Sequence, residues 1–443
     1  MLACSVLDEH QCVDQAGFRP GVGRTHHLFT VAMVQEKRHE WQQCVWISAI
    51  DFQKAFDSVQ HSCIWEALER QGAPGGYVRL LKNLYSGQSG RVRTDRLSKE
   101  FDILRGTKQG DPLSSLLFNA VLEDVFAEVK PSWEKKGWGL RLGYSKYRQL
   151  TNLRFADDVL LIGTSLRQLK QMLIDLKEAA MKRGLLLHPG KTKILSNATK
   201  RAGRPKDSHV KVGNMNIEVV PYEGKVKYLG RQVSFDRPHD VEVEHRINMA
   251  WTSFMAQRDE LTNKRYSLNA RLRLFDATVS NVFLYGSTTW VLTQELTDRV
   301  RRVQRKMLRM ILGSRRRQLI EEGSSRGTSS MTSDSNSLSG DPELEPWVDW
   351  LHRTARELEE RCRKLHVRDW VEAHRNAASK WLGQLQEGKD SWARRALEWE
   401  LFGRTRRAAR PRSRWADSWA YAAPPTPCGR VVVATSGCCL TYA

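Results

Sequence analysis

The first half of the chain alternates between two spacings of hydrophobic residues. CVWISAID at 44–51 is apolar on both faces, which is typical of a strand in the centre of a sheet. His61–Gln71 has apolar residues at helical spacing, and Gly72 follows it as a helix-ending residue. This alternation runs from Cys44 to about Gly230 and predicts a mixed α+β domain. A further amphipathic helix, ending at Gly184, is indicated by Leu166, Leu169, Met172, Leu173 and Leu176.

From about 240 to 312 the pattern is helical. The apolar stripes are Ile247, Trp251 and Phe254, and then Leu296, Val300, Val303, Met307 and Met310. The helix with the second stripe carries mostly basic residues on its remaining surface, and acidic residues are nearly absent after Asp298. Such a surface is either an ordinary solvated face or a contact for phosphates, and the lack of acidic neighbours favours phosphates. The candidate nucleic-acid contacts on this helix are Arg301, Arg302 and Arg305.

The last quarter of the chain changes composition several times. GSSRGTSSMTSDSNSLSG at 323–340 is too rich in serine and glycine to bury much surface, so a flexible linker is expected there. A Trp-rich helical segment is predicted over 347–402, and six arginines follow between 404 and 414. A disordered tail is expected beyond Pro424.

Two adjacent aspartates interrupt an apolar stretch, RFADDVLLIG at 154–163. A buried, unpaired carboxylate costs several kcal/mol or more. On a continuous strand Asp157 and Asp158 would point to opposite faces and could not act together. A strand–turn–strand with the pair at its tip resolves both problems. The alternative is a polar hairpin turn, in which aspartate is common.

The overall charge narrows the class of partner. Lys plus Arg exceeds Asp plus Glu by 71 − 50 = 21, and the pI is about 9.8. Such an excess favours a polyanion, with nucleic acid ahead of an acidic membrane surface. No apolar run approaches the roughly 18 residues that span a bilayer, and the start MLACSVLDEH lacks the basic region of a signal peptide. The scattered cysteines fit a reducing, intracellular compartment.

A third carboxylate, Asp51, ends the apolar strand in AIDFQKAFDSV. Three aspartates brought together can hold two Mg²⁺ ions, since hard oxygen ligands suit this ion. Two ions roughly 4 Å apart can stabilise the attacking and leaving oxygens of a phosphoryl transfer. A third stretch, RGTKQGDPLSSLLFN at 105–119, combines Gly110, which allows close backbone approach, with Pro112, which suits the first turn of a helix. The amides at that helix start could face a polar ligand.

In this order the stretches resemble the reverse transcriptase domain of non-LTR (LINE-type) retrotransposons, from Gln15 to about Gly313. AIDFQKAFDSV is similar to the family's motif A, RGTKQGDPLSSLLFN to motif B, and LRFADDVLLIG to the aspartate-pair motif C. The other similarities are QAGFRPGVGRTHHLF (15–29) to the fingers motif, GLLLHPGKTKIL (184–195) to motif D, KYLGRQVS (227–234) to the primer grip, FLYGSTTW and the helix ending RKMLRMILG to the thumb, and ARPRSRWADSW (409–419) to a C-terminal GRPRxRW element, with Ala409 in place of its glycine.

The resemblance implies a right-hand polymerase, an α+β fold with a ferredoxin-like palm, partial fingers and a helical thumb. The implied domains are partial fingers at 1–43, a palm with inserted fingers segments at 44–235, a helical thumb at 236–320, a disordered linker at 321–346, a basic Trp/Arg-rich helical segment at 347–422, and a disordered tail at 423–443.

The family's catalytic residues carry over position by position. Asp51 and Asp157 would be the metal ligands, and Asp158 would complete the carboxylate cluster. Lys191 would be a general acid for the leaving pyrophosphate, or else an ordinary surface lysine. Phe56 corresponds to the aromatic gate beneath the incoming sugar, with a core aromatic as the alternative.

Other positions would bind the nucleotide, the primer or the nucleic acid. Gln109 would line the nucleotide pocket, and Gly110 would let the backbone approach it. Arg19 would lie near the template or the triphosphate, or else form a salt bridge. The primer end would be steadied by Tyr228, Leu229 and Gly230, and further nucleic-acid contacts would come from Arg410, Arg412 and Arg414.

The activity implied is RNA-directed DNA synthesis from dNTPs with two Mg²⁺ ions, or Mn²⁺ in their place. The partners implied are an RNA template, a DNA primer and their hybrid, with no membrane, and the basic runs are compatible with a nuclear signal. An upstream fingers block, an endonuclease and a Cys–His knuckle are not found in the sequence, so an N-terminally truncated copy is expected. The second hypothesis is a catalytically silent, nucleic-acid-binding remnant. Viral RNA-dependent RNA polymerases fit less well, because five residues separate Asp51 from Asp57 and Ala156 precedes the aspartate pair.

Overall fold

The computed structural model describes residues 2–108, 110–142, 149–199, 203–313, 316–317, 344–388, 391–399 and 414–415. The chain divides into two compact units. The first comprises Met1–Glu242, Gly286–Val291 and Ala377–Ala443, and the second comprises Val243–Tyr285 and Leu292–Asn376. The serine-rich stretch 323–340, the arginine run 404–414 except for Arg414, and the tail beyond Pro424 lie outside the described residues.

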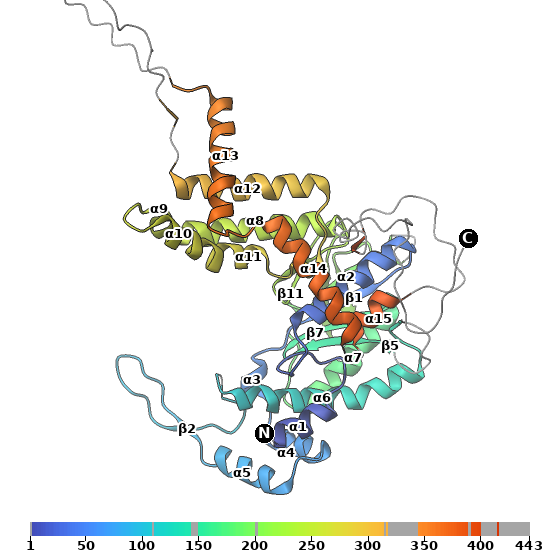
Figure 1. Ribbon diagram of the computed structural model, residues 1–443. Coiled ribbons are helices and arrows are strands. Elements are labelled where there is room, and N and C mark those ends of the chain that lie inside the picture. Colours follow the sequence, from blue (N-terminus) through green and yellow to red (C-terminus); the bar gives the residue numbers. More distant parts are fainter. Residues whose placement is uncertain are drawn as a thin grey trace, which may run out of the picture. The chain divides into compact units, whose positions relative to one another are not determined.

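A six-stranded sheet forms the centre of the first unit (Figure 1). Its order is β6-β7-β1-β8-β10-β9, and β1 pairs antiparallel with both β7 and β8. The predicted central strand is therefore confirmed as β1. The strands are β1 (Trp46–Ile50), β6 (Asn152–Phe155), β7 (Asp158–Gly163), β8 (Lys193–Ser196), β9 (His209–Val212) and β10 (Met215–Val219).

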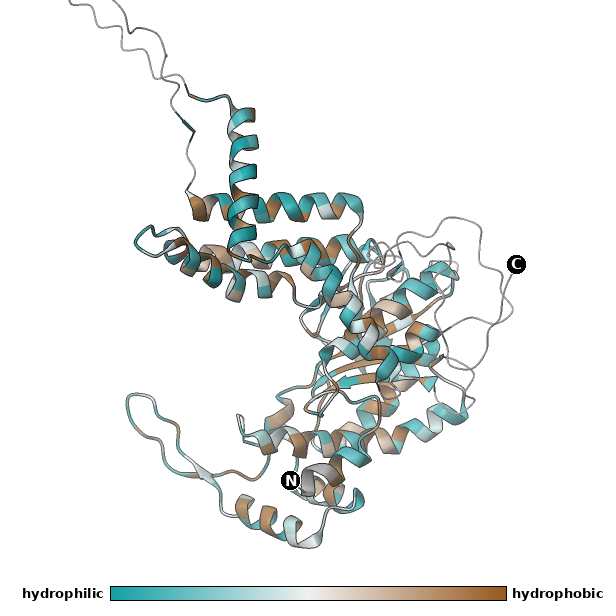
Figure 2. Cartoon of the chain, in the orientation of Figure 1, coloured by the Kyte–Doolittle hydropathy of each residue, from teal (hydrophilic) through white to brown (hydrophobic). Residues whose placement is uncertain are grey.

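Four of these strands and two helices make a ferredoxin-like core, as predicted. In chain order they are β1, α6 (Pro112–Lys135), β6, β7, α7 (Leu166–Met181) and β8. The four strands lie in the order 4-1-3-2 across the sheet, which is the order of a split βαβ fold. Apolar side chains of the two helices and the strands form the core, and Figure 2 shows the strands as mostly hydrophobic.

Shorter elements surround this core. Helix α4 confirms the helix predicted at His61–Gln71, and Gly72 follows it with a φ of +75°. Helix α7 ends at Met181, three residues before the predicted Gly184, whose φ is +82°. The other elements are α1 (Leu2–His10), α2 (Arg24–Glu40), α3 (Ala55–Ser58), α4 (His61–Arg70), α5 (Gly75–Tyr85), β2 (Ser89–Gly90), β3 (Phe101–Asp102), β4 (Leu140–Arg141), β5 (Gln149–Leu150), β11 (Val226–Tyr228) and β12 (Arg231–Val233).

The second unit is helical, as the pattern from 240 to 312 predicts. Phe254, Val300 and Met307 of the two predicted stripes are buried. Trp370 stacks on Phe283 with ring centroids 4.2 Å apart. No described helix is both long and apolar enough to cross a membrane. The elements are α8 (Pro238–Ala256), α9 (Arg258–Thr262), α10 (Leu268–Phe275), the π-helix η2 (Asp276–Ser280), α11 (Asn281–Phe283), α12 (Gln294–Leu312), α13 (Trp347–Lys364) and α14 (Trp370–Glu387), with α8 and α14 crossing the unit boundaries.

The tryptophan-rich segment predicted at 347–422 is divided between the two units. Trp370 belongs to the second, whereas α15 (Trp392–Glu398) packs against α2 in the first. Trp415 also lies on α2, with its ring centroid 4.7 Å from that of Phe29. The short 3₁₀ helix η3 (Ser287–Thr289) contacts the same helix. Segments from both ends of the chain thus share one core around α2.

Helix α2 buries a histidine on its inner face. His27 is 2% exposed, and the Tyr228 hydroxyl lies 3.5 Å from its Nδ1. Among the described residues, Nε2 has no hydrogen-bond partner. Burial lowers the pKa of His27 to about 3, because a charged imidazolium would be poorly solvated there. His27 is therefore neutral in the folded protein.

We expect His27 to make the first unit sensitive to acid. Between about pH 6.5 and pH 3 the unfolded chain binds a proton at this residue that the folded chain does not bind, so stability falls as the pH is lowered. The loss at pH 5 relative to pH 7.5 is about 2 kcal/mol. Urea unfolding of a His27→Gln variant should show a loss smaller by that amount. His39→Gln, a change at an exposed position of the same helix, is the control for the substitution itself. Equal acid sensitivity of His27→Gln and the wild type would contradict the prediction.

Candidate active site

Asp51 is the first residue after the central strand β1. The amide of His188 donates to its carbonyl oxygen at 2.8 Å, which ties the end of β1 to the loop before β8. Its side chain is 41% exposed, and the Lys191 ammonium lies 3.7 Å from Oδ2. No described group donates a hydrogen bond to that oxygen. The carboxylate is thus held near a positive charge, while Oδ2 accepts no hydrogen bond from the described residues.

Asp157 and Asp158 lie at the tip of the β6–β7 hairpin, which confirms the predicted strand–turn–strand. Phe155 pairs with Asp158, so Ala156 and Asp157 form the two-residue loop. Ala156 has a φ of +53°, a strained conformation for a residue with a side chain. Ile50 pairs with Val159 on the neighbouring strand, which brings the hairpin tip beside Asp51. Strand register therefore gathers all three aspartates at one end of the sheet.

The three carboxylates repel one another. Desolvation raises the pKa of Asp157, and Asp51 adds to the increase. Desolvation also raises the pKa of Asp158 to about 6, with further contributions from Asp157 and then Asp51, while Lys227 acts in the opposite direction. Among the described residues, no three His, Cys, Asp or Glu side chains converge closely enough to hold a metal ion. The carboxylates thus share an electrostatic environment without forming a closed ligand set.

A buried hydrogen-bond network supports the hairpin turn. Gln15 Oε1 accepts from the amides of Ala156, at 3.2 Å, and Gly17, at 2.8 Å. Gln15 Nε2 donates to Asn119 Oδ1 at 3.1 Å, and Asn119 Nδ2 donates to the Gly17 carbonyl at 2.8 Å. A Cβ on Gly17 would lie 2.6 Å from the Ala156 nitrogen, so only glycine fits. Sequence reasoning missed Gln15 and Asn119, although both lie within stretches that it singled out.

The nucleotide-binding candidates lie on two connected segments. Phe56, in α3, is half-buried with its ring 4.7 Å from that of Phe118, and its carbonyl accepts from Thr107 N at 2.7 Å. Gly110 has a φ of +90°, and a Cβ there would meet nothing within 4 Å, so its backbone conformation explains the glycine. Pro112 begins α6 as predicted, and Asp111 caps the helix. Gln109 lies outside the described residues.

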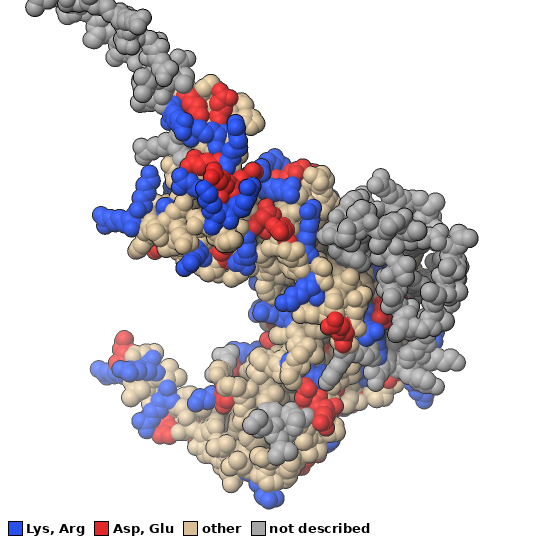
Figure 3. All heavy atoms as spheres, viewed as in Figure 1, with Lys and Arg blue, Asp and Glu red and all other residues tan. Residues whose placement is uncertain are grey.

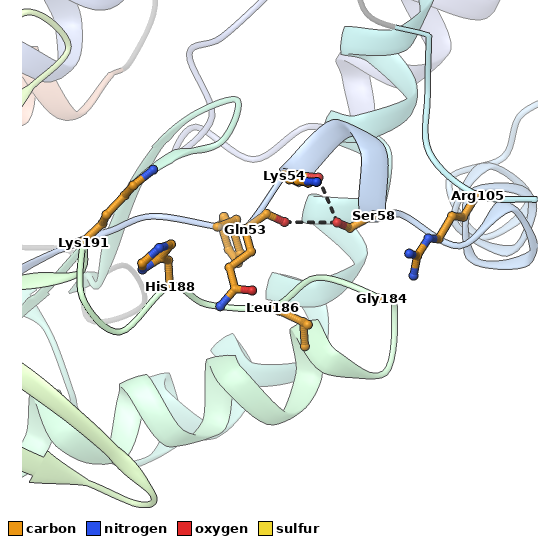
Figure 4. Close-up of a pocket in the computed structure, with 9 residues that line it drawn as sticks. Gln53, Lys54, Ser58, Arg105, Gly184, Leu186, His188 and Lys191 are labelled. Atoms are coloured by element: carbon orange, nitrogen blue, oxygen red, sulfur yellow. Dashed lines mark hydrogen bonds between the residues drawn. The ribbon is translucent and has the colours of Figure 1, made fainter. Parts of the chain in front are cut away.

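A pocket of about 490 Å³ lies beside Asp51 and is lined by Lys191 (Figure 4). Its basic side chains come from the start of α3, the stretch before α6 and the loop before β8, and its lining contains no carboxylate. Lys54 adopts a φ of +44° at the start of α3. Nδ1 of His188 is buried and has no hydrogen-bond partner among the described residues. The four basic residues are Lys54, Arg105, His188 and Lys191.

Arg19 is used inside the fold. Its Nε lies 2.6 Å from Asp8 Oδ1, and its Nη1 donates to the carbonyls of Cys12 and Gln15. The structure therefore favours the salt-bridge alternative for Arg19 over a nucleotide contact. This difference arises because the partner, Asp8, belongs to a helix to which sequence reasoning gave no role.

The predicted primer-grip residues form the β11–β12 hairpin. Tyr228 pairs with Arg231, and the loop residues Leu229 and Gly230 have φ values of +46° and +78°. Two consecutive positive φ angles are typical of the tight turns that join antiparallel strands. Tyr228 is buried, and both this burial and the Asp158 carboxylate raise its pKa. The hairpin therefore lies within electrostatic reach of the aspartate pair.

Two of the basic nucleic-acid candidates, Arg305 and Arg414, have acidic partners in space that the sequence did not reveal. Arg305 of α12 pairs with Glu359 of α13 at 2.8 Å, and Figure 3 shows basic and acidic groups intermixed over these helices. Arg302 Nε donates to the Asp298 carbonyl at 3.3 Å. Arg301 is partly exposed on the same helix. Arg414 pairs with Glu40 at 2.7 Å, whereas Arg410 and Arg412 lie outside the described residues.

Comparison with known proteins gives the family. The reverse transcriptase (RNA-dependent DNA polymerase) family matches residues 2–233. The chain is 35% identical over 163 residues to the Pol polyprotein of the type-2 retrotransposable element R2DM of Drosophila melanogaster, covering 36% of this chain and 14% of that protein. It is 30% identical over 235 residues to a type-1 element R2 polyprotein of Nasonia vitripennis, covering 51% and 22%.

Two further likenesses differ in extent. A putative transposon-derived protein of Caenorhabditis elegans is 28% identical over 276 residues, which cover 61% of this chain and 84% of that protein. A telomerase structure from Candida albicans superposes with a TM-score of 0.40 and 12% identity over 71% of this chain and 54% of that one. The chain thus spans less than a quarter of the length of the two R2 polyproteins.

The family match covers more than half of the chain, and the R2 polyproteins are among its relatives, so the predicted resemblance is confirmed. This protein belongs to the reverse transcriptase family, and its fold is the right-hand polymerase fold with a ferredoxin-like palm.

Proposed function

We propose that the chain is an RNA-directed DNA polymerase, which adds dNTPs to a DNA primer along an RNA template. The observation that supports this most strongly is the gathering of Asp51, Asp157 and Asp158 at one end of the palm sheet, with raised pKa values for the pair. Like charges held together in this way are costly unless a cation offsets them. The cationic pocket beside Asp51 adds a place for phosphates.

The carboxylates fit divalent metal ions by their chemistry. All the donors are hard oxygens, which suit Mg²⁺ or Mn²⁺, and Asp51 Oδ2 accepts no hydrogen bond from the described residues. Asp51 and Asp157 would hold the ions, with Asp158 completing the cluster. When bound, two such ions stabilise the charge on the attacking and leaving oxygens of a phosphoryl transfer.

The chain's own residues would bind and orient the reactants. Lys191, which is 66% exposed and lies 3.7 Å from Asp51, can donate a proton to the leaving pyrophosphate. Lys54 and Arg105, in the same pocket, would attract its phosphates. Phe56 would lie under the incoming sugar. Tyr228, Leu229 and Gly230 would steady the primer end, so that its 3′-hydroxyl points toward the α-phosphate.

Asp157→Asn should lower primer extension on an RNA template by several orders of magnitude, because each lost 1.4 kcal/mol or so of transition-state stabilisation costs about tenfold in rate. Binding of the RNA–DNA hybrid should change little. Asp207, an exposed aspartate on the same unit, provides the control: Asp207→Asn should retain full activity. Extension unaffected by Asp157→Asn would refute the site, and no extension by the wild-type chain would favour the silent nucleic-acid-binding remnant.

Phe56→Val should raise ribonucleotide incorporation while dNTP use falls only modestly. A bulky ring under the sugar leaves no room for a 2′-hydroxyl, so a smaller side chain removes that clash. The neighbouring Phe118 is fully buried and serves as the matched control: Phe118→Leu should reduce the use of both substrates equally, through poorer packing. Single-nucleotide incorporation with each substrate measures the ratio. An equal loss for both substrates in Phe56→Val would identify Phe56 as a core residue only.

Arg301, Arg302 and Arg305 on α12 should bind phosphates in a way that is blind to sequence. Changing all three to Gln should flatten the plot of log affinity against log salt by roughly 0.7 to 0.9 for each phosphate that is no longer neutralised. Titration of the RNA–DNA hybrid at several salt concentrations measures that slope. The exposed Arg258, Arg265 and Arg273 of the same unit, changed together to Gln, give an equal charge change and should leave the slope nearer the wild-type value. Equal slopes for both triple variants would exclude a specific role for α12.

A further inference from the structure

The C-terminal segment, defined here as residues 377–388, 391–399 and 414–415, is anchored firmly to helix α2. The Trp415 amide donates to Glu36 at 2.8 Å, and its indole Nε1 donates to the Thr288 carbonyl at 2.7 Å. Lys37 Nζ donates to the carbonyls of Leu397 and Trp399, at 2.6 Å and 2.5 Å. These hydrogen bonds fix α15, Trp399 and Trp415 against α2 and η3.

From α15 one side chain reaches a buried carboxylate beside the active-site hairpin. The Trp392 indole Nε1 donates to Asp14 Oδ1 at 2.6 Å. Asp14 is fully buried, and its other oxygen accepts from Lys130 Nζ at 2.5 Å and Asn152 Nδ2 at 3.2 Å. Trp392 is 3% exposed and is the only indole donor to this carboxylate among the described residues. Segments from near both ends of the chain therefore meet at Asp14.

Asp14 is in turn bonded to the strand that carries the catalytic turn. The Arg154 amide donates to the Asp14 carbonyl at 2.7 Å, and the Ala16 amide donates to the Arg154 carbonyl at 2.9 Å. Gln15 and Arg154 thus form a parallel bridge outside the named strands. The next link is Gln15, which accepts from the amide of Ala156, the residue before Asp157. The path from Trp392 to the turn is continuous and buried.

We infer that Trp392 is a positioning residue for the Asp157–Asp158 turn, acting through Asp14 and Gln15. The strained φ of Ala156 persists only while its surroundings hold it, and Gln15 supplies the hydrogen bond to that residue. Removing the indole donor would free one oxygen of Asp14 and loosen residues 14–17, so the turn would open more often. The consequence for catalysis rests on the proposed function, whereas the coupling itself does not.

A purely structural role for Trp392 makes a different prediction, and the chain offers a matched control. Trp381 is also buried in the C-terminal segment and packs its ring against His26 and Phe29, but its Nε1 has no hydrogen-bond partner among the described residues. Trp392→Phe removes a ring nitrogen that donates to Asp14. Trp381→Phe removes a ring nitrogen that donates to nothing described. Both changes replace a buried indole by a phenyl ring, so a difference between them reports on the hydrogen bond.

Hydrogen exchange followed by mass spectrometry tests the coupling in the full chain without relying on activity. Trp392→Phe should speed exchange in the peptide around 153–158 by roughly tenfold or more, because it removes the hydrogen bond to the charged Asp14 carboxylate that supports this peptide. Trp381→Phe should not. Gln15→Met, which removes the acceptor for the Ala156 amide, should reproduce the faster exchange with Trp392 intact, and it decides the second link if Trp392→Phe does not fold.

Equal exchange of this peptide in Trp392→Phe and Trp381→Phe would overturn the inference, as would unchanged exchange in Gln15→Met. Where primer extension is detectable, Trp392→Phe should lower kcat with little change in the KM for dNTP, because the turn and not the nucleotide pocket is disturbed. If the wild-type chain extends no primer, the proposed function is wrong, but the exchange result still decides whether Trp392 is coupled to the Asp157–Asp158 turn.

Discussion

The structure depends on holding three like charges together at the end of one sheet. Asp51 follows β1, and the register of β1 with β7 places the hairpin tip beside it. Desolvation, with added repulsion from Asp157 and then Asp51, raises the pKa of Asp158 to about 6. A positive φ at Ala156 adds strain of the order of 1–3 kcal/mol. Packing and hydrogen bonds elsewhere in the palm must offset both the repulsion between the carboxylates and the backbone strain at Ala156.

The residues that hold the β6–β7 hairpin in place include several buried charges. Arg154 of β6 is fully buried, pairs with Glu123 at 2.9 Å, and lies with its guanidinium carbon 4.5 Å from the centre of the Phe126 ring. Burial raises the pKa of Asp14, but Lys130 and Arg154 outweigh this and hold it below its usual value. Buried ion pairs seldom add much net stability, but they penalise any arrangement that separates the partners. Strand β6 is the last strand of the six-stranded sheet, and the parallel bridge between Gln15 and Arg154 ties its outer side to this network.

The sequence was sufficient for whatever depends on local spacing. Strand β1, helix α4 and the hairpin at Asp157–Asp158 follow from apolar periodicity and from the cost of burying an aspartate pair. Contacts between distant residues could not be inferred in this way. Trp392 and Asp14 lie 378 residues apart, and neither stands out in its own stretch. The same limit applies to Arg305, whose acidic partner Glu359 comes from another helix, so the basic surface of α12 has acidic neighbours that its own stretch of sequence does not reveal.

The basic residues behind the net charge of +21 include two sets with different surroundings. Arg154, Arg183 and Arg414 are paired with carboxylates inside the first unit and serve its architecture. The pocket beside Asp51 differs, since four of its lining residues are basic and none is acidic. The function proposed above requires a polyanionic nucleotide to approach a negatively charged site, and a positive surface next to the aspartates would reconcile these demands. Lys191 joins the two regions: it lines the basic pocket and its ammonium lies 3.7 Å from the Asp51 carboxylate.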